Sequence, residues 1–64
     1  FRSMTDREKE VLRLIAQGKR THEIGDCMKI STLTVSTHVK NIYRKMQVRT
    51  RAQAVRYAVM KGII

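Results

Sequence analysis

Apolar residues recur along this chain at the spacing of helical faces. The clearest stripe advances by 4, 3 and 4 residues, and it consists of Val35, Val39, Ile42 and Met46. Such steps keep side chains on one side of an α-helix. Shorter stripes lie in three other segments, whose expected core residues are Val11, Leu12, Ile15, Ile24, Cys27, Met28, Ala54, Val55 and Ala58. No segment reads convincingly as a strand, so the pattern predicts an all-α fold.

Capping residues set the limits of the four predicted helices. Hydroxyl side chains that can accept hydrogen bonds from free amides precede each of them, namely Thr5, Thr21, Ser31 and Thr50. Glu8 stands three residues after Thr5, which is the spacing of a capping box. Gly18 and Gly62 are placed to end the first and last helices. We predict helices over about residues 6–17, 21–28, 32–46 and 50–61.

The second and third helices are spaced as a helix-turn-helix. Gly25 provides a small residue where the two backbones would cross, and Val35 points inward ten residues later. Lys29 stands near the turn position where glycine is common. Either Lys29 adopts a left-handed backbone conformation, or the turn has another geometry.

The start of the third helix, "STLTVSTHVK", is rich in β-branched residues. These side chains are short and stiff, so another surface can approach the helix closely. The opposite side from the apolar stripe carries hydroxyls first and cations afterwards, which suits a helix lying in a groove of nucleic acid. The alternative for Thr32 and Thr34 is that their hydroxyls cap the helix or bond back to its carbonyls.

Charge is divided unevenly along the chain. Fourteen Lys and Arg stand against five Asp and Glu, for a formal net charge of +9, and all five acids lie within residues 1–26. From Cys27 onward there is no carboxylate to balance eight cationic side chains. A field of one sign suits a polyanion, and nucleic acid is the first candidate.

The chain is short enough for a single domain over residues 1–64. It begins with Phe1, so we interpret it as a domain excised from a longer protein, with residues 1–3 as a linker remnant. Its single cysteine, Cys27, cannot form an internal disulfide, which favours the reducing cytoplasm. The N-terminus lacks the apolar region of a signal peptide, which argues against export or membrane insertion.

Catalysis finds little support in these residues. The group that could carry it is His22, Asp26, Cys27 and His38, whose spacing matches no metal site. A glycine-rich phosphate loop is also absent. We therefore expect neither an enzyme nor a metal or other cofactor, and a structural role for His38.

Across residues 4–64 the chain resembles the LuxR/FixJ/GerE-type DNA-binding domain of bacterial transcription regulators. The matching pieces are "TDREKEVL", "IAQGK", "EIG", "TVSTHVKNIYRKM" and "RAQAV". The resemblance implies four helices around a central helix-turn-helix. Two departures stand out: Gly25 replaces a usual alanine, and Met46 and Gln47 replace a commoner Leu-Gly pair.

The resemblance also implies which residues meet double-stranded DNA. Those expected to read bases are Ser36, Thr37 and Lys40. Those expected to contact phosphates, by resemblance and by charge, are Lys19, Arg20, Thr21, Thr34, Asn41, Arg44 and Lys45. A phosphate contact is the alternative for Lys40. RNA polymerase is a further partner to consider for the regulator.

Dimerisation on two-fold sites is the remaining implication. Gln53, Tyr57 and Met60 lie on a face of the fourth helix separate from its inward residues, and they are the dimer candidates. The alternative is that Tyr57 and Met60 close the monomer's own core together with Ile63 and Ile64. An RNA-binding or protein-interaction module using the same basic surface is the alternative function, although aromatic residues for stacking on RNA are few.

Overall fold

Four helices make up the part of the chain that the structure describes, residues 4–63 of a computed structural model. They are α1 (Asp6–Ala16), α2 (Thr21–Met28), α3 (Thr32–Met46) and α4 (Arg51–Met60). No strand occurs within these residues, so the predicted all-α class is confirmed. The expected linker remnant at residues 1–3, and the role considered for Ile64, lie outside the described residues.

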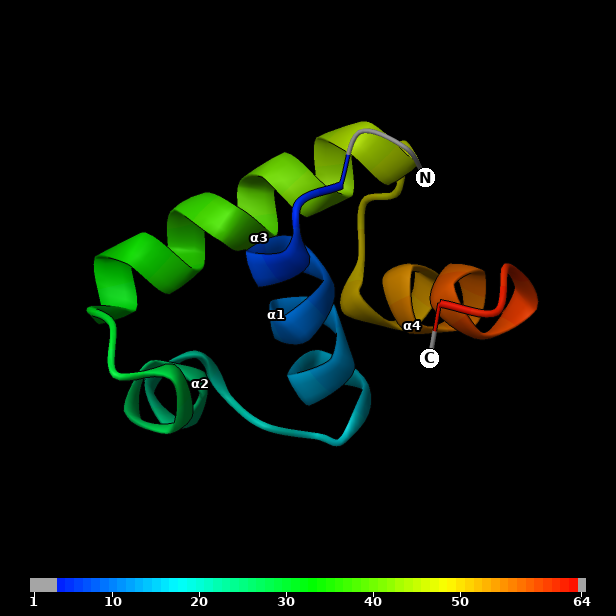
Figure 1. The fold of residues 1–64 in the computed structure, drawn as a ribbon. Coiled ribbons are helices and arrows are strands. Elements are labelled where there is room, and N and C mark those ends of the chain that lie inside the picture. Colours follow the sequence, from blue (N-terminus) through cyan, green and yellow to red (C-terminus); the bar gives the residue numbers. More distant parts are fainter. Residues whose placement is uncertain (1–3, 64) are drawn as a thin grey trace.

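The longest helix, α3, lies along one side of the molecule, and the other three pack on a single side of it (Figure 1). In this view α1 lies in the middle, with α2 and α4 to either side of it. Between the helices lies one apolar core, formed by Met4, Val11, Leu12, Leu14, Ile15, Ile24, Val35, Ile42, Met46, Ala54 and Ala58. The side of α3 that faces away from this core is therefore left for other contacts.

The helix ends follow the capping pattern, with small differences. The Thr5 hydroxyl accepts from the Glu8 amide at 3.1 Å, and the Glu8 carboxylate accepts from the Thr5 amide at 3.0 Å, which confirms the capping box. α1 ends at Ala16 rather than residue 17. α4 spans 51–60 rather than 50–61, because Thr50 is its N-cap and the residue after Met60 its C-cap.

The prediction that Thr21 caps α2 is wrong. Thr21 is the first residue of the helix, and Arg20 occupies the N-cap position with an extended backbone. An arginine side chain has no acceptor for the free amides. The Glu23 carboxylate instead accepts from the Arg20 amide at 2.7 Å. The α2 start is therefore held by a carboxylate from inside the helix rather than by a hydroxyl in front of it.

The placement of Cys27 in the core is also wrong, since this residue is exposed. Buried residues on α2 are Ile24 and Gly25, with Met28 partly buried against the core. At about 100° per residue, the middle of that face lies between Ile24 and Gly25, and Cys27 falls well to one side of it. The helix is turned so that its glycine, and not its cysteine, meets the neighbouring turn.

Gly25 lies where α2 packs tightly against the turn that leads into α3. A Cβ atom at this position would stand 2.9 Å from the Ile30 carbonyl oxygen and 3.7 Å from a Val35 methyl. Lys29 adopts the left-handed conformation at φ 58°, so the first of the two predicted turn geometries is confirmed. The turn is thereby short enough to bring the start of α3 directly onto α2.

Candidate nucleic-acid interface

The outward face of α3 repeats the spacing of its buried face. Exposed side chains advance by 4, 3 and 4 residues, as the inward stripe does, and we call this set the outward stripe: Leu33, Thr37, Lys40 and Arg44. It runs from an apolar residue and a hydroxyl at the N-terminal end to two cations further along. α1, α2 and α4 all lie on one side of α3 (Figure 1), and the exposure of the outward stripe places it on the side that faces away from them.

The three residues predicted to read bases do not occupy equivalent positions. Thr37 and Lys40 are exposed on the outward stripe, whereas Ser36 is half-buried at its flank. The Thr37 hydroxyl donates to the Leu33 carbonyl oxygen at 3.1 Å, one turn earlier in the helix. Of the three, Lys40 projects from the outward stripe with a full set of ammonium donors for an acceptor-rich surface.

Two phosphate candidates lie together near the C-terminal part of α3. The Arg44 guanidinium donates to the side-chain oxygen of Asn41, one turn earlier. Asn41 is half-buried, while Arg44 is exposed. This contact orders the arginine on the helix surface and leaves its remaining donors available to an anion.

Thr34 takes part in the N-terminal cap of α3. Its amide donates to the Ser31 hydroxyl at 3.0 Å, and the two hydroxyl oxygens lie 2.8 Å apart. The cap is thus supplied by Ser31, and the Thr34 hydroxyl contacts the Ser31 hydroxyl rather than a backbone group of the helix. The side chain remains exposed at the helix start.

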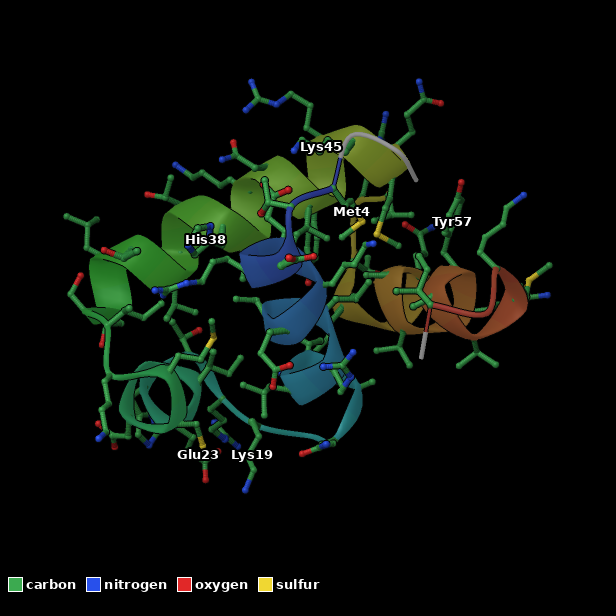
Figure 2. The ribbon with its side chains drawn as sticks, in the orientation of Figure 1. Met4, Lys19, Glu23, His38, Lys45 and Tyr57 are labelled. Atoms are coloured by element: carbon green, nitrogen blue, oxygen red, sulfur yellow. The ribbon has the colours of Figure 1, made fainter. Side chains whose placement is uncertain are left out.

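A partly buried ion pair joins α1 to α3, and sequence reasoning did not find it. The Lys45 ammonium lies 2.7 Å from the carboxylate of Glu8, which is only 3% exposed. Figure 2 shows Lys45 on α3 above the N-terminal end of α1. The signal that could have found it is Glu8 itself, an acid among the inward positions of a helix. Lys45 is thus held in the fold, and its positive charge is balanced by the Glu8 carboxylate.

The ionisation of Glu8 follows from its surroundings. Burial alone would raise its pKa, but hydrogen bonds from Lys45 and from the Thr5 amide, together with the positive charges of Lys45 and His38, outweigh that effect. The pKa of Glu8 therefore lies below its ordinary value. The pair is ionic at neutral pH, and it links α3 to the start of α1.

The other phosphate candidates gather at the start of α2. Lys19 and Thr21 are half-buried and Arg20 is exposed. Lys19 lies beside α2, away from α3 (Figure 2). The structure therefore does not bring this group onto the outward stripe. The pKa of Glu23 in the same turn is lowered, chiefly by the hydrogen bond from the Arg20 amide.

A second arginine supports the fold rather than a surface. The Arg51 guanidinium donates to the Ile15 carbonyl oxygen at 3.0 Å and also to the Lys19 carbonyl oxygen. These carbonyls belong to the end of α1 and the loop after it, where acceptors lack helical partners. One of the cations counted from the sequence is thus committed to joining α4 to α1.

The dimer candidates on α4 differ in burial. Tyr57 is partly buried and packs against the core, as does Ile63, while Met60 is 73% exposed. Tyr57 projects from the side of α4 nearer to α3 (Figure 2), and the Lys61 ammonium lies 5.8 Å from its ring centre. The Gln53 side chain accepts from the Arg49 amide at 2.8 Å. A hollow of about 260 Å³ on this face is lined by Gln47, Val48, Gln53, Arg56, Tyr57 and Met60.

The residues considered for metal binding do not come together in the described part of the chain. Within residues 4–63, no three His, Cys, Asp or Glu side chains come together in a way that could hold a metal ion. His38 is half-buried, close enough to Glu8 to influence its charge. None of the four described helices has the length and apolar character needed to cross a membrane.

Comparisons with known proteins place the chain among bacterial regulatory proteins with this arrangement of helices. Residues 2–58 match the family described as bacterial regulatory proteins, luxR family. The chain is 44% identical over all 64 residues to the response regulator protein VraR of Staphylococcus aureus strain Mu3, and equally to that of Staphylococcus epidermidis. It spans 31% of the length of these relatives.

A solved structure shows the same arrangement of helices. The response regulator ChrA, from a heme-sensing two-component system, superposes with a TM-score of 0.92 over 97% of this chain and 31% of that one, at 32% identity. The family match, the curated relatives and the fold therefore point the same way. The chain belongs to the LuxR family of bacterial regulatory proteins.

Proposed function

We propose that this domain binds double-stranded DNA in a sequence-specific manner, as the output domain of a bacterial transcription regulator. The observation that carries the proposal is the outward stripe of α3, which projects from the three-helix support with a hydroxyl near its start and Lys40 and Arg44 beyond it. With side chains, an α-helix is about 10–12 Å across, and the major groove of B-DNA is about 12 Å wide. A projecting helix of this kind fits that groove.

The roles of individual residues follow from their positions along α3. The N-terminal half would lie deepest in the groove, where Ser36, Thr37 and Lys40 meet base edges. Lysine is suited to guanine, whose N7 and O6 are both acceptors in the major groove. Arg44, which donates to Asn41, lies one turn beyond Lys40, where the helix would leave the groove and approach the backbone. Thr34 and Lys45 would add phosphate contacts from the two ends of α3.

The group at the start of α2 would hold a neighbouring stretch of backbone. Lys19 and Arg20 supply charge, and Thr21 stands in the first turn of α2, where free amides favour anions. Contacts on two sides of the groove would fix the orientation of α3 within it, because phosphate contacts set register without reading sequence.

Assembly on DNA completes the proposal. A homodimer through α4 would place two α3 helices on a two-fold site, with Tyr57, Met60 and Gln53 at the contact. The hollow beside Tyr57 and the exposed Met60 support this assignment, since one offers a recess and the other an apolar side chain. RNA polymerase is a further partner of the intact regulator, in the cytoplasm.

The test separates base reading from phosphate binding. Bound duplexes selected from a random pool would define the preferred site, and Lys40→Ala and Arg44→Ala would then be measured on it and on each single-base-pair substitution. We expect Lys40→Ala to cost about 1–3 kcal/mol on the preferred site and to relax the preference at one base pair. Arg44→Ala should weaken binding to all duplexes about equally, because its target is sequence-blind.

Two results would contradict the assignment. An unchanged ranking of sites for Lys40→Ala would make Lys40 a phosphate contact instead of a base-reading residue. Tighter binding to single-stranded or duplex RNA than to the selected DNA would replace the proposed function by the RNA-binding alternative.

A further inference from the structure

Leu33 is an apolar side chain in an unexpected place. It is 77% exposed, and within residues 4–63 the other large exposed apolar side chains, Val59 and Met60, both belong to α4. An isolated exposed leucine is ordinary on a protein surface. Leu33, however, is the first member of the outward stripe, one turn before Thr37 and two turns before Lys40. It therefore stands at the leading end of the proposed recognition surface.

The backbone that carries Leu33 is held on both sides. Ser31 caps the helix through the Thr34 amide at 3.0 Å, and the Leu33 carbonyl accepts from the Thr37 hydroxyl at 3.1 Å. The preceding turn is fixed by the approach of Gly25 to the Ile30 carbonyl, since a Cβ would stand only 2.9 Å from that oxygen. Because this first turn is fixed, the Leu33 side chain leaves the helix in a defined direction. A residue that discriminates between bases needs such a fixed orientation.

At this end of the outward stripe, the two side chains present little beyond apolar groups. The Thr37 hydroxyl has one proton, and that proton is engaged by the Leu33 carbonyl, so Thr37 presents a methyl group and an acceptor but no donor. In the major groove, a base pair meets an apolar side chain through the 5-methyl group of thymine, which no other base carries. A donor-poor, apolar leading end therefore matches thymine.

We propose that Leu33 is a specificity-determining residue that packs against the 5-methyl group of a thymine in the recognised site. This inference rests on the proposed function, because it requires α3 to lie in the major groove. It specifies which base is recognised and where: a thymine that lies nearer the N-terminal end of α3 than the base pair read by Lys40.

The test removes the methyl group from the DNA and the side chain from the protein. In the selected duplex, each thymine of a half-site is replaced in turn by deoxyuridine, which lacks only the 5-methyl group. Affinities are measured for the wild type and for Leu33→Ala. For the wild type we expect one position at which the replacement weakens binding roughly three- to fivefold, the worth of one buried methyl group. For Leu33→Ala we expect no difference between thymine and deoxyuridine there.

A matched control keeps this outcome distinct from loss of the fold or of DNA binding. Val59→Ala removes an exposed apolar side chain from α4, and it should keep the wild-type preference for thymine. Leu33→Ala should unfold at the wild-type temperature and keep the base preference that depends on Lys40.

Three results would overturn the inference. The first is that deoxyuridine weakens binding of the wild type and of Leu33→Ala equally. The second is that deoxyuridine weakens binding of the wild type at no position. Both results leave the proposed function in place. The third is a wild-type domain that prefers no duplex, which overturns the proposed function as well.

Discussion

The ion pair between Glu8 and Lys45 gives a prediction about stability that its geometry makes specific. Replacing Glu8 by glutamine keeps the shape of the side chain and an oxygen that can accept from the Thr5 amide, because glutamine also serves in a capping box. What is removed is the charge that meets the Lys45 ammonium at 2.7 Å. The variant thus isolates the pairing from the cap.

The size of the effect follows from burial. Removing one partner of a fully buried pair costs about 3–5 kcal/mol, because the other charge is left without compensation. The Lys45 side chain is 29% exposed, so its ammonium can regain some water. We therefore expect Glu8→Gln to lower the free energy of unfolding by about 1–2 kcal/mol. For a domain of this size, that corresponds to a melting temperature lower by about 4–16 °C.

A double-mutant cycle measures the pairing directly. The free energy of unfolding in urea is determined for Glu8→Gln, for Lys45→Met and for the double variant, and we expect a coupling of about 1 kcal/mol at pH 7. The matched control is Glu10→Gln on the same helix, which breaks the solvent-exposed pair with Arg13 and should cost less than about 0.5 kcal/mol. A coupling indistinguishable from zero would refute the role assigned to this pair.

The same pair predicts a direction with pH. The pKa of Glu8 in the folded state is lowered, so the group stabilises the fold fully above its unfolded pKa, and this stabilisation is lost as pH falls through the folded pKa. The difference in stability between the wild type and Glu8→Gln should therefore shrink as the pH falls below about 4.5. A difference that grows as the solution is acidified would contradict the sign of the shift.

Three further predictions concern the turns and assembly. Gln47→Gly should raise the free energy of unfolding by about 0.5–1 kcal/mol in urea unfolding, because Gln47 adopts a left-handed conformation at φ 57°; a loss of stability would refute this. Gly25→Val should lower it by about 2–3 kcal/mol, since even a Cβ would stand 2.9 Å from the Ile30 carbonyl oxygen; an unchanged urea midpoint would show that the turn can move. Tyr57→Ala should weaken binding to a paired site much more than to an isolated half-site in gel-shift titrations, whereas equal losses would reject the dimer role.

Most of the fold could be predicted from the sequence because its signals are local. The stripe from Val35 to Met46 and the caps at Thr5, Ser31 and Thr50 act within a few residues of the chain, and all are seen in the structure. The helix-turn-helix followed from one glycine and one spacing. Such signals act between neighbouring residues, so they do not depend on tertiary contacts between segments that are far apart in the sequence.

The errors concern features that depend on tertiary packing. Cys27 was placed inward from the apolar pattern of α2, but the close approach at Gly25 turns the helix and exposes it. The Glu8–Lys45 pair joins residues 37 positions apart, and no local pattern indicates which of the many lysines would meet the one buried acid. The significance of Leu33 depends on a contact that the sequence does not show, the hydrogen bond that takes up the Thr37 hydroxyl proton.

Binding of the selected duplex as a function of salt tests the central claim most directly. A domain that neutralises several phosphates releases their counterions, so the logarithm of the association constant should fall linearly with the logarithm of salt concentration, by about 0.9 per phosphate contact. With Arg44 and the cations at the start of α2 engaged, we expect affinity to fall by orders of magnitude between about 50 and 200 mM salt. An association constant that stays flat over this range would contradict DNA binding through the basic surface of α3 and α2.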